Sequence, residues 1–251
     1  MTYRASNGTA DRALRLLGLF DDARPAITAA DVARELGVAR STAYRYVKGL
    51  VAAGFLAAEP GGGLTVGPRV VELAELARRG VGIGAIALPA MRDLRDAIGE
   101  TVLLTRRVGG QIVCVERVEA PGHVRISYER GTTLPPHAGA GALVLLAWEP
   151  EATARRLLAA APLERFTPRT EIEVDRLLAR LAEIRELGVA RSLAELDDDI
   201  TGIAAPVRDT GGRVVAGIGI AALSRRVSRA RLRTMQDALL GATAAVERAL
   251  S

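Results

Sequence analysis

The chain has 251 residues, of which 49% are hydrophobic and 25% are charged, and we therefore expect a folded protein of one large or two modest domains. Its single cysteine, Cys114, excludes an internal disulfide and fits a reducing compartment, and two histidines are too few for a His/Cys metal cluster. No apolar run reaches the ~18 residues that span a membrane. The N-terminus also lacks the apolar core of a signal peptide, so a cytoplasmic protein is expected.

The formal net charge is +5, and Lys48 is the only lysine, so arginine supplies nearly all the positive charge. Residues 1–80 carry a net charge of +3 and residues 81–251 carry +2. Arginine suits phosphate and guanine, but an arginine-rich genome would give the same bias. Any basic surface must therefore come from where the arginines are placed rather than from their number.

The first segment predicts a helix over residues 10–21, capped by Thr9 and ended before Pro25. A second helix is predicted after Thr28, because Thr28 and Asp31 form a start similar to a capping box. Gly37 then supplies the tight turn that precedes a third helix. This order is typical of a helix-turn-helix.

Residues 39–54 are predicted to form the recognition helix, because a period of 3.6 separates two faces. The apolar face consists of Ala43, Tyr46, Val47, Leu50 and Val51, and the opposite face of Arg40, Ser41, Tyr44, Arg45 and Lys48. The second face carries the donors and cations that base edges and phosphates require. By itself, this pattern also fits an ordinary amphipathic helix with a solvated basic face.

A hairpin is predicted next, with strands at 55–59 and 64–66 and a glycine-rich turn at 60–63. Such a wing lets backbone approach the sugar-phosphate surface closely. Three successive elements in this order predict a winged helix-turn-helix DNA-binding domain over residues 1–68.

Residues 69–84 are interpreted as a linker helix, interrupted by glycines at 80–84. Its apolar face combines Val71, Leu73, Leu76 and Ala77. A second subunit would cover this face in a homo-oligomer, and packing on its own domain is the alternative.

Residues 85–251 predict an α+β domain in which helices surround an antiparallel sheet. The expected strands are 101–107, 111–118, 124–128, 189–193, 200–208 and 213–222. The expected helices are 85–98, one that ends near Trp148, 151–160, 171–187 and 229–250.

No catalytic motif and no metal-ligand set is found in this second domain. The acidic residues at 195–199 are interpreted as a solvated loop rather than a metal site. Cys114 lies in an apolar run and is expected to be a buried, unreactive thiol. For His137, binding a ligand and fixing its own loop remain equal alternatives.

Two glycine-rich segments suggest a small-molecule pocket. In the loop 131–141, small residues precede a helix and would leave backbone N–H groups open to an acceptor such as a carboxylate. Residues 216–222 form a strand whose side chains are too small to fill the space beside them. If the two segments face each other, a pocket results; tight packing of the helix start on the sheet is the alternative.

Several motifs resemble the IclR family of bacterial transcriptional regulators across nearly the full length of the chain. They lie at residues 12–17, 36–45, 50–56, 99–102, 134–140, 203–207 and 211–216. The resemblance implies a winged helix-turn-helix, a linker helix and a GAF-like effector domain. It also implies a homodimer or dimer of dimers on palindromic double-stranded operator DNA, with no enzyme activity and no cofactor.

The resemblance places Arg40, Ser41, Thr42, Tyr44 and Arg45 where the family reads DNA, and we add Lys48 as a phosphate contact. The expected effector-binding residues are Tyr128, Leu134, His137, Gly139, Ala140, Gly141, Ser192, Gly202, Gly219 and Ala221. Where some acid-binding members have polar side chains in the last strands, this chain has mostly small ones.

These departures predict an effector with an apolar or aromatic body and a carboxylate or amide held at the Gly139–Gly141 backbone. We therefore expect a ligand-responsive DNA-binding regulator, and specifically a repressor. The alternatives are a winged-helix protein whose second domain is a small-molecule enzyme, or an interaction module that binds another protein.

Overall fold

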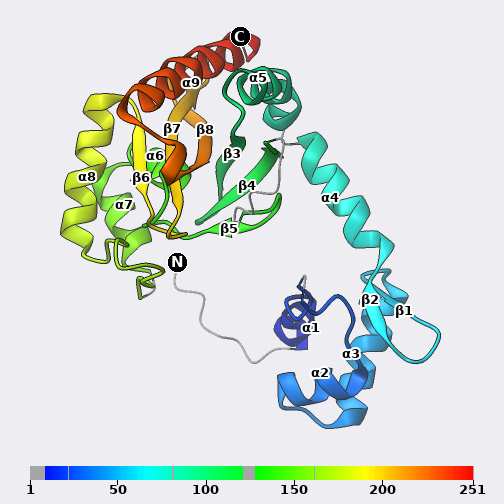
Figure 1. Cartoon of the computed structure of the whole chain (residues 1–251). Helices are drawn as coiled ribbons and strands as arrows, with labels where there is room; N and C mark the ends of the chain where they lie inside the picture. Colours follow the sequence, from blue (N-terminus) through cyan, green and yellow to red (C-terminus); the bar gives the residue numbers. More distant parts are fainter. Residues whose placement is uncertain (1–8, 22, 81, 121–127, 161, 251) are drawn as a thin grey trace. The chain divides into compact units, whose positions relative to one another are not determined.

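A computed structural model describes residues 9–21, 23–80, 82–120, 128–160 and 162–250 (Figure 1). The chain divides into two compact units, residues 1–81 and 82–251. The strand expected at 124–128 lies outside the described residues, except for Tyr128.

The first unit contains four described helices and a two-stranded hairpin. The helices are α1 (Thr9–Leu17), α2 (Ala29–Leu36), α3 (Arg40–Ala52) and α4 (Pro68–Gly80), and the strands are β1 (Leu56–Ala58) and β2 (Leu64–Val66). The expected helix-turn-helix with its wing is therefore confirmed. Its core joins Leu16, Val32, Tyr46 and Leu56, all buried.

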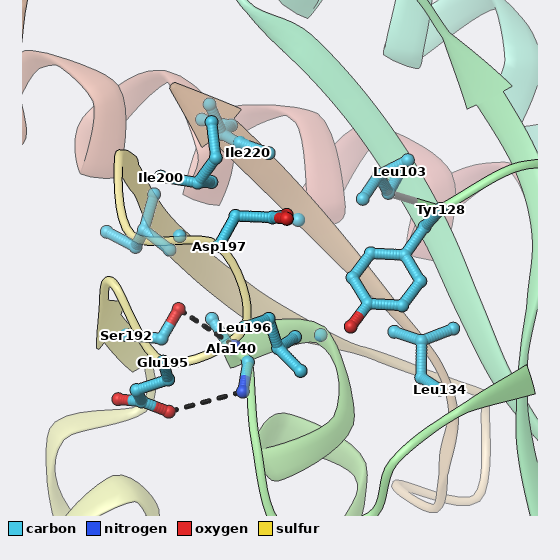
Figure 2. Close-up of a pocket in the computed structure, with 16 residues that line it drawn as sticks. Leu103, Tyr128, Leu134, Ala140, Ser192, Glu195, Leu196, Asp197, Ile200 and Ile220 are labelled. Carbon is cyan, nitrogen blue, oxygen red and sulfur yellow. Dashed lines mark hydrogen bonds between the residues drawn. The ribbon is translucent and has the colours of Figure 1, made fainter. Parts of the chain in front are cut away.

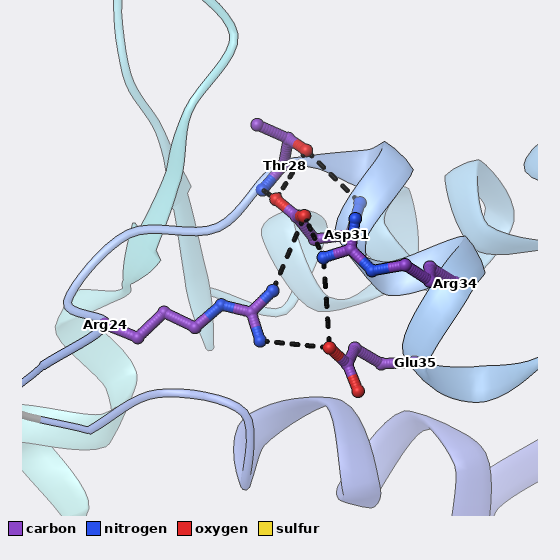
Figure 3. A network of polar contacts seen from close by, with 5 residues as sticks. All are labelled: Arg24, Thr28, Asp31, Arg34 and Glu35. Atoms are coloured by element: carbon purple, nitrogen blue, oxygen red, sulfur yellow. Dashed lines mark hydrogen bonds and ion pairs between the residues drawn. The ribbon is translucent and has the colours of Figure 1, made fainter.

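The start of α2 is a capping box, as predicted (Figure 3). The Asp31 amide donates to Thr28 Oγ1 at 3.2 Å, and the Thr28 amide donates to Asp31 Oδ2 at 2.9 Å. Arg24 and Arg34 both pair with the Asp31 carboxylate, and Arg24 also reaches Glu35. This network anchors the segment before α2 to the helix. Its hydrogen bonds, those from Thr28 first, lower the pKa of Asp31 to about 2.

The first helix is shorter than predicted. It ends at Leu17 rather than at residue 21, because Gly18 is a poor helix former and its amide closes a turn on the Arg15 carbonyl. Leu19 and Phe20 nevertheless pack against the core, so their apolar spacing reflects burial rather than helix.

The second unit contains one six-stranded antiparallel sheet in the order β5-β4-β3-β8-β7-β6. Its strands are β3 (Thr101–Val108), β4 (Gln111–Val118), β5 (Thr133–Leu134), β6 (Ala190–Leu193), β7 (Ile200–Arg208) and β8 (Val214–Leu223). Its helices are α5 (Ile83–Ile98), α6 (Ala140–Leu146), α7 (Glu151–Leu158), α8 (Val174–Leu187) and α9 (Arg229–Ala249), with a short 3-10 turn η1 (Ser224–Arg226).

Helices cover both faces of this sheet. α5 and α9 pack on one face, whereas α6 packs on β3, β6, β7 and β8 from the other, with α7 and α8 beyond it (Figure 1). The expected α+β architecture is therefore confirmed. Since α6 begins directly after the loop at 135–139, the fold presents the start of this helix to the central strands.

Element boundaries in this unit differ from expectation at four places. α5 begins at Ile83 rather than at residue 85, α6 ends at Leu146 before Trp148, and α8 begins at Val174 rather than at residue 171. The strand β5 was not predicted. It exists because Leu134 pairs with Ile112 of β4, a partner that only the tertiary structure supplies.

Within the part of the chain that the structure describes, no helix is both long and apolar enough to span a bilayer.

Candidate functional site

The polar face of α3 is exposed in the way the sequence predicts. Arg40, Ser41, Tyr44, Arg45 and Lys48 are exposed, and Thr42 is half-buried. Tyr44 is 64% exposed, which is high for an aromatic side chain. The opposite face buries Ala43, Tyr46 and Val47 against the core, so packing determines which face of α3 points outward.

The cations of this face are unengaged within the described chain. Arg40, Arg45 and Lys48 form no ion pair or hydrogen bond with any described residue, whereas Arg24 and Arg34 are paired. The first turn of α3 has no acidic residue, and Ala39 provides no side-chain cap. Unsatisfied N–H groups beside cations form a site for anions such as phosphate.

The second unit contains a cavity between α6 and the sheet, with about 530 Å³ of space free of atoms and partly open to solvent. Figure 2 shows its walls, which come from α6, the strands and the segment before β7. The described lining residues are Leu103, Tyr128, Leu134, Gly139, Ala140, Gly141, Ser192, Glu195, Leu196, Asp197, Ile200, Gly202, Ile203, Gly219, Ile220 and Ala221.

Nine of the ten expected effector residues line this cavity, with His137 the exception. Strand register explains part of the grouping. Ser192 of β6 pairs with Gly202 of β7, which in turn pairs with Ala221 of β8. These three residues form one row across the sheet, because side chains of directly paired residues lie on the same face.

Two glycines of β8 show why this strand lacks bulk. A Cβ at Gly217 would lie 2.6 Å from Val144 Cγ1 of α6, so this glycine permits close packing. A Cβ at Gly219 would meet nothing closer than 3.6 Å. The strand therefore combines both expected explanations, with close approach at Gly217 and open cavity at Gly219.

The start of α6 differs from expectation. The Gly139 amide donates to Glu195 Oε2 at 3.2 Å, and the Ala140 amide donates to Ser192 Oγ at 3.1 Å. These two N–H groups are therefore already occupied by side chains of the protein. The expected carboxylate site on the Gly139–Gly141 backbone is thus wrong for Gly139 and Ala140.

The interpretation of residues 195–199 as a solvated acidic loop is wrong for Glu195. This side chain is buried, and its Oε1 pairs with Arg180 at 2.6 Å. Asp198 and Asp199 are exposed, whereas Asp197 lies half-buried on the cavity wall. Among the described residues, no group of three or more acidic, His or Cys side chains is placed to bind a metal ion.

Tyr128 and Asp197 supply the other polar groups of the cavity. Figure 2 shows both side chains pointing into the same space. Burial, with the negative charge of Asp197 as a second cause, raises the pKa of Tyr128 well above its ordinary value. The phenol is therefore neutral at physiological pH, able to donate and to accept a hydrogen bond.

His137 fixes its own loop. It is buried, its Nε2 donates to the Glu164 carbonyl at 2.8 Å, and its ring stacks on Phe166 with centroids 5.7 Å apart. It lines a wider neighbouring hollow rather than the cavity beside α6. Cys114 is fully buried, and burial raises the pKa of its thiol to about 11, as expected for an unreactive cysteine.

Sequence reasoning missed several lining residues, among them Leu103, Glu195, Leu196, Asp197 and Ile200. Leu103 could have been found, since a β3–β8 pairing places it directly beside Gly219. Glu195 and Asp197 had no local signal, because only the fold brings their loop to the start of α6.

Family comparisons agree with both units. Residues 9–60 match the IclR helix-turn-helix domain, and residues 77–248 match the domain described as bacterial transcriptional regulator IclR C-terminal. The chain is 31% identical to the transcriptional regulator XynR of Escherichia coli over 242 residues, which cover 96% of each protein. It is 28% identical to the transcriptional repressor AllR of the same species, over 88% of this chain and 82% of AllR.

A solved structure gives the same result. An IclR homologue from Microbacterium hydrocarbonoxydans, complexed with 4-hydroxybenzoate, matches with a TM-score of 0.84 and 27% identity, over 97% of this chain and 99% of that one. Matches to both domains of the family, with a relative above 30% identity along nearly the whole length, leave one conclusion. The chain belongs to the IclR family of transcriptional regulators, with a DNA-binding helix-turn-helix domain and an effector-binding C-terminal domain.

Proposed function

We propose that this protein is a repressor that binds a palindromic operator as a homodimer or dimer of dimers and responds to a small molecule in the cavity beside α6. The observation that carries the DNA-binding part is the exposed face of α3, whose cations have no partner among the described residues. AllR, a relative of this chain, is a transcriptional repressor, which supports the same role here.

In this proposal α3 enters the major groove. Arg40 and Arg45 contact bases or phosphates, Lys48 contacts a phosphate, and Ser41, Thr42 and Tyr44 add donors and contact area. The tip of the wing, where Gly61 and Gly62 have positive φ, has no side chain to block its approach to the backbone of the DNA.

The effector in this proposal has an apolar or aromatic body. The lining of the cavity is mostly aliphatic, and Tyr128 offers one aromatic face. The homologue bound to 4-hydroxybenzoate supports an aromatic ligand. We assign no catalytic residue, since Ser192 and Glu195 are already engaged with the start of α6.

The DNA-binding part is tested with Arg45→Ala on a genomic fragment selected by the wild-type protein. If Arg45 contacts a base, affinity should fall by ~1–3 kcal/mol, which a gel shift at fixed salt measures. Arg156→Ala is the matched control, because Arg156 is an exposed arginine of α7 in the other unit.

Unchanged affinity of Arg45→Ala would remove this residue from the interface. A wild-type complex whose affinity does not depend on salt would contradict DNA binding through phosphates, because counterion release makes that binding steeply salt-dependent.

A further inference from the structure

The charges on the cavity wall are one-sided. Among the described residues that line it, the ionisable side chains are Tyr128, Glu195 and Asp197, and none is a cation. A carboxylate entering the cavity would therefore meet like charges without an opposing arginine, lysine or histidine on the described wall.

Glu195 is not available to a ligand. One carboxylate oxygen pairs with Arg180 at 2.6 Å and the other accepts from the Gly139 amide at 3.2 Å. This ion pair lies in the structure of the wall and is close to neutral as a unit. Asp197 is consequently the charged group that a ligand encounters.

Asp197 and Tyr128 point into the same space (Figure 2). Asp197 carries an acceptor, and the neutral phenol of Tyr128 carries both a donor and an acceptor. The remaining wall around them is apolar, including Leu103, Leu134 and Ile220. Since a charged acceptor strengthens a hydrogen bond, the best ligand head for this wall is one that donates.

The protein also lacks the donors that a carboxylate would need. The amides of Gly139 and Ala140 at the start of α6 are bonded to Glu195 and Ser192. A carboxylate head would have to displace one of these bonds, or lose its hydration without full compensation.

We propose that Asp197 selects the effector by its head group, so that the cavity takes an aromatic or apolar molecule ending in an ammonium or a neutral N–H or O–H donor and disfavours a carboxylate. This inference rests on the proposed effector-binding function and adds the chemical class of the ligand. Asp197 acts as the specificity-determining residue.

Three probes with the same ring test the inference: 4-hydroxybenzylamine, 4-hydroxybenzyl alcohol and 4-hydroxybenzoate. Calorimetric titration of the full-length protein should rank the amine first, the alcohol second and the carboxylate last. The amine should bind roughly tenfold or more tightly than the carboxylate, because a hydrogen bond to a charged group has about that effect on affinity. Tightest binding of the carboxylate, or binding of none of the three, would overturn the inference.

The variant Asp197→Asn keeps the shape and removes the charge. It should weaken the amine by roughly tenfold or more and narrow its advantage over the carboxylate. Asp198→Asn is the matched control, because Asp198 is the adjacent residue and is exposed. Equal effects of the two variants would contradict the role of Asp197, and the wild-type ranking of the probes remains decisive if Asp197→Asn folds poorly.

A gel shift without any probe separates this inference from the proposed function. If wild-type protein binds its selected DNA while the carboxylate binds tightest, the regulator stands and the head-group inference falls. If wild-type protein binds no DNA, the proposed function fails, whatever the ranking of the probes.

Discussion

Gly217 and Gly219 lie two residues apart on one face of β8, yet they have different surroundings. Gly217 faces α6 closely enough that a Cβ would approach Val144 Cγ1 to 2.6 Å, whereas Gly219 faces the cavity with nothing closer than 3.6 Å to a Cβ. Substitutions at the two positions should therefore separate folding from ligand binding.

Gly219→Val should fill part of the cavity and weaken effector binding while leaving the fold intact. Gly217→Ala is the matched comparison, and it should destabilise the second unit by ~1–3 kcal/mol through overpacking against α6. Urea unfolding followed by the fluorescence of Trp148 measures stability, and calorimetry with the best of the three probes measures binding. Loss of stability in Gly219→Val equal to that in Gly217→Ala would show that Gly219 has no free space before it.

Asp31 predicts a pH dependence of the first unit. Its pKa in the folded protein is about 2, below its ordinary value of 3.8, because Thr28 and Arg34 stabilise the charged form. A lowered pKa stabilises the fold above the unfolded value, and this contribution is lost as the pH falls from about 4 through 2. The gap in unfolding free energy between wild type and Asp31→Asn should accordingly shrink between neutral pH and acid. Urea unfolding followed by far-ultraviolet circular dichroism measures this gap, and a gap that is constant with pH would rule out the ionic role of Asp31.

At the scale of elements, the two helices of the helix-turn-helix begin in opposite ways. α2 has a complete capping box, whereas α3 begins after Ala39 with no side-chain cap, no acidic residue in its first turn and Arg40 at its first position. A helix start that carries a cation and lacks a cap is costly for an isolated fold. The same start suits a helix that meets a phosphate.

Ala39→Asp should therefore move stability and DNA affinity in opposite directions. The new cap should stabilise the protein by ~0.5–2 kcal/mol, while its charge repels phosphate and weakens the DNA complex. Ala39→Ser is the control, since serine caps the helix without a charge and should stabilise while largely preserving DNA binding. If Ala39→Asp binds DNA as tightly as Ala39→Ser, the start of α3 lies away from the phosphates.

At the scale of the whole molecule, the first unit leaves apolar side chains uncovered. Val71 of α4 is 60% exposed, and Leu73 of α4 and Leu14 of α1 are exposed as well. A second copy of the chain would remove these side chains from water, which is the basis for expecting a homo-oligomer.

The double variant Val71→Glu, Leu73→Glu should reduce the oligomer to a smaller species and weaken binding to a palindromic site, because two half-sites are no longer held together. Sedimentation velocity measures the first effect. Val108→Glu is the control, since Val108 is exposed on β3 in the other unit. An unchanged sedimentation coefficient in the double variant would show that this face of α4 does not hold the subunits together.

Much of the first unit could be predicted from sequence because its signals are local. Thr28, Asp31 and Gly37 specify the start and end of α2 through contacts three or four residues away. The apolar spacing of α3 likewise identifies its buried face, which contains Ala43, Tyr46 and Val47. The strand β5 and the end of α1 could not be predicted in this way, since a two-residue pairing and an apolar turn have no period of their own.

The sequence by itself determined the order of the elements, the membership of the family and the two segments that meet at the cavity. Only the tertiary structure decided the chemistry of that cavity. The acceptors that occupy the amides of Gly139 and Ala140 lie more than fifty residues further along the chain, on Glu195 and Ser192. Contacts of that separation depend on strand register and loop path rather than on local periodicity, and for this reason an expected carboxylate site became a wall on which Asp197 is the charge that a ligand meets.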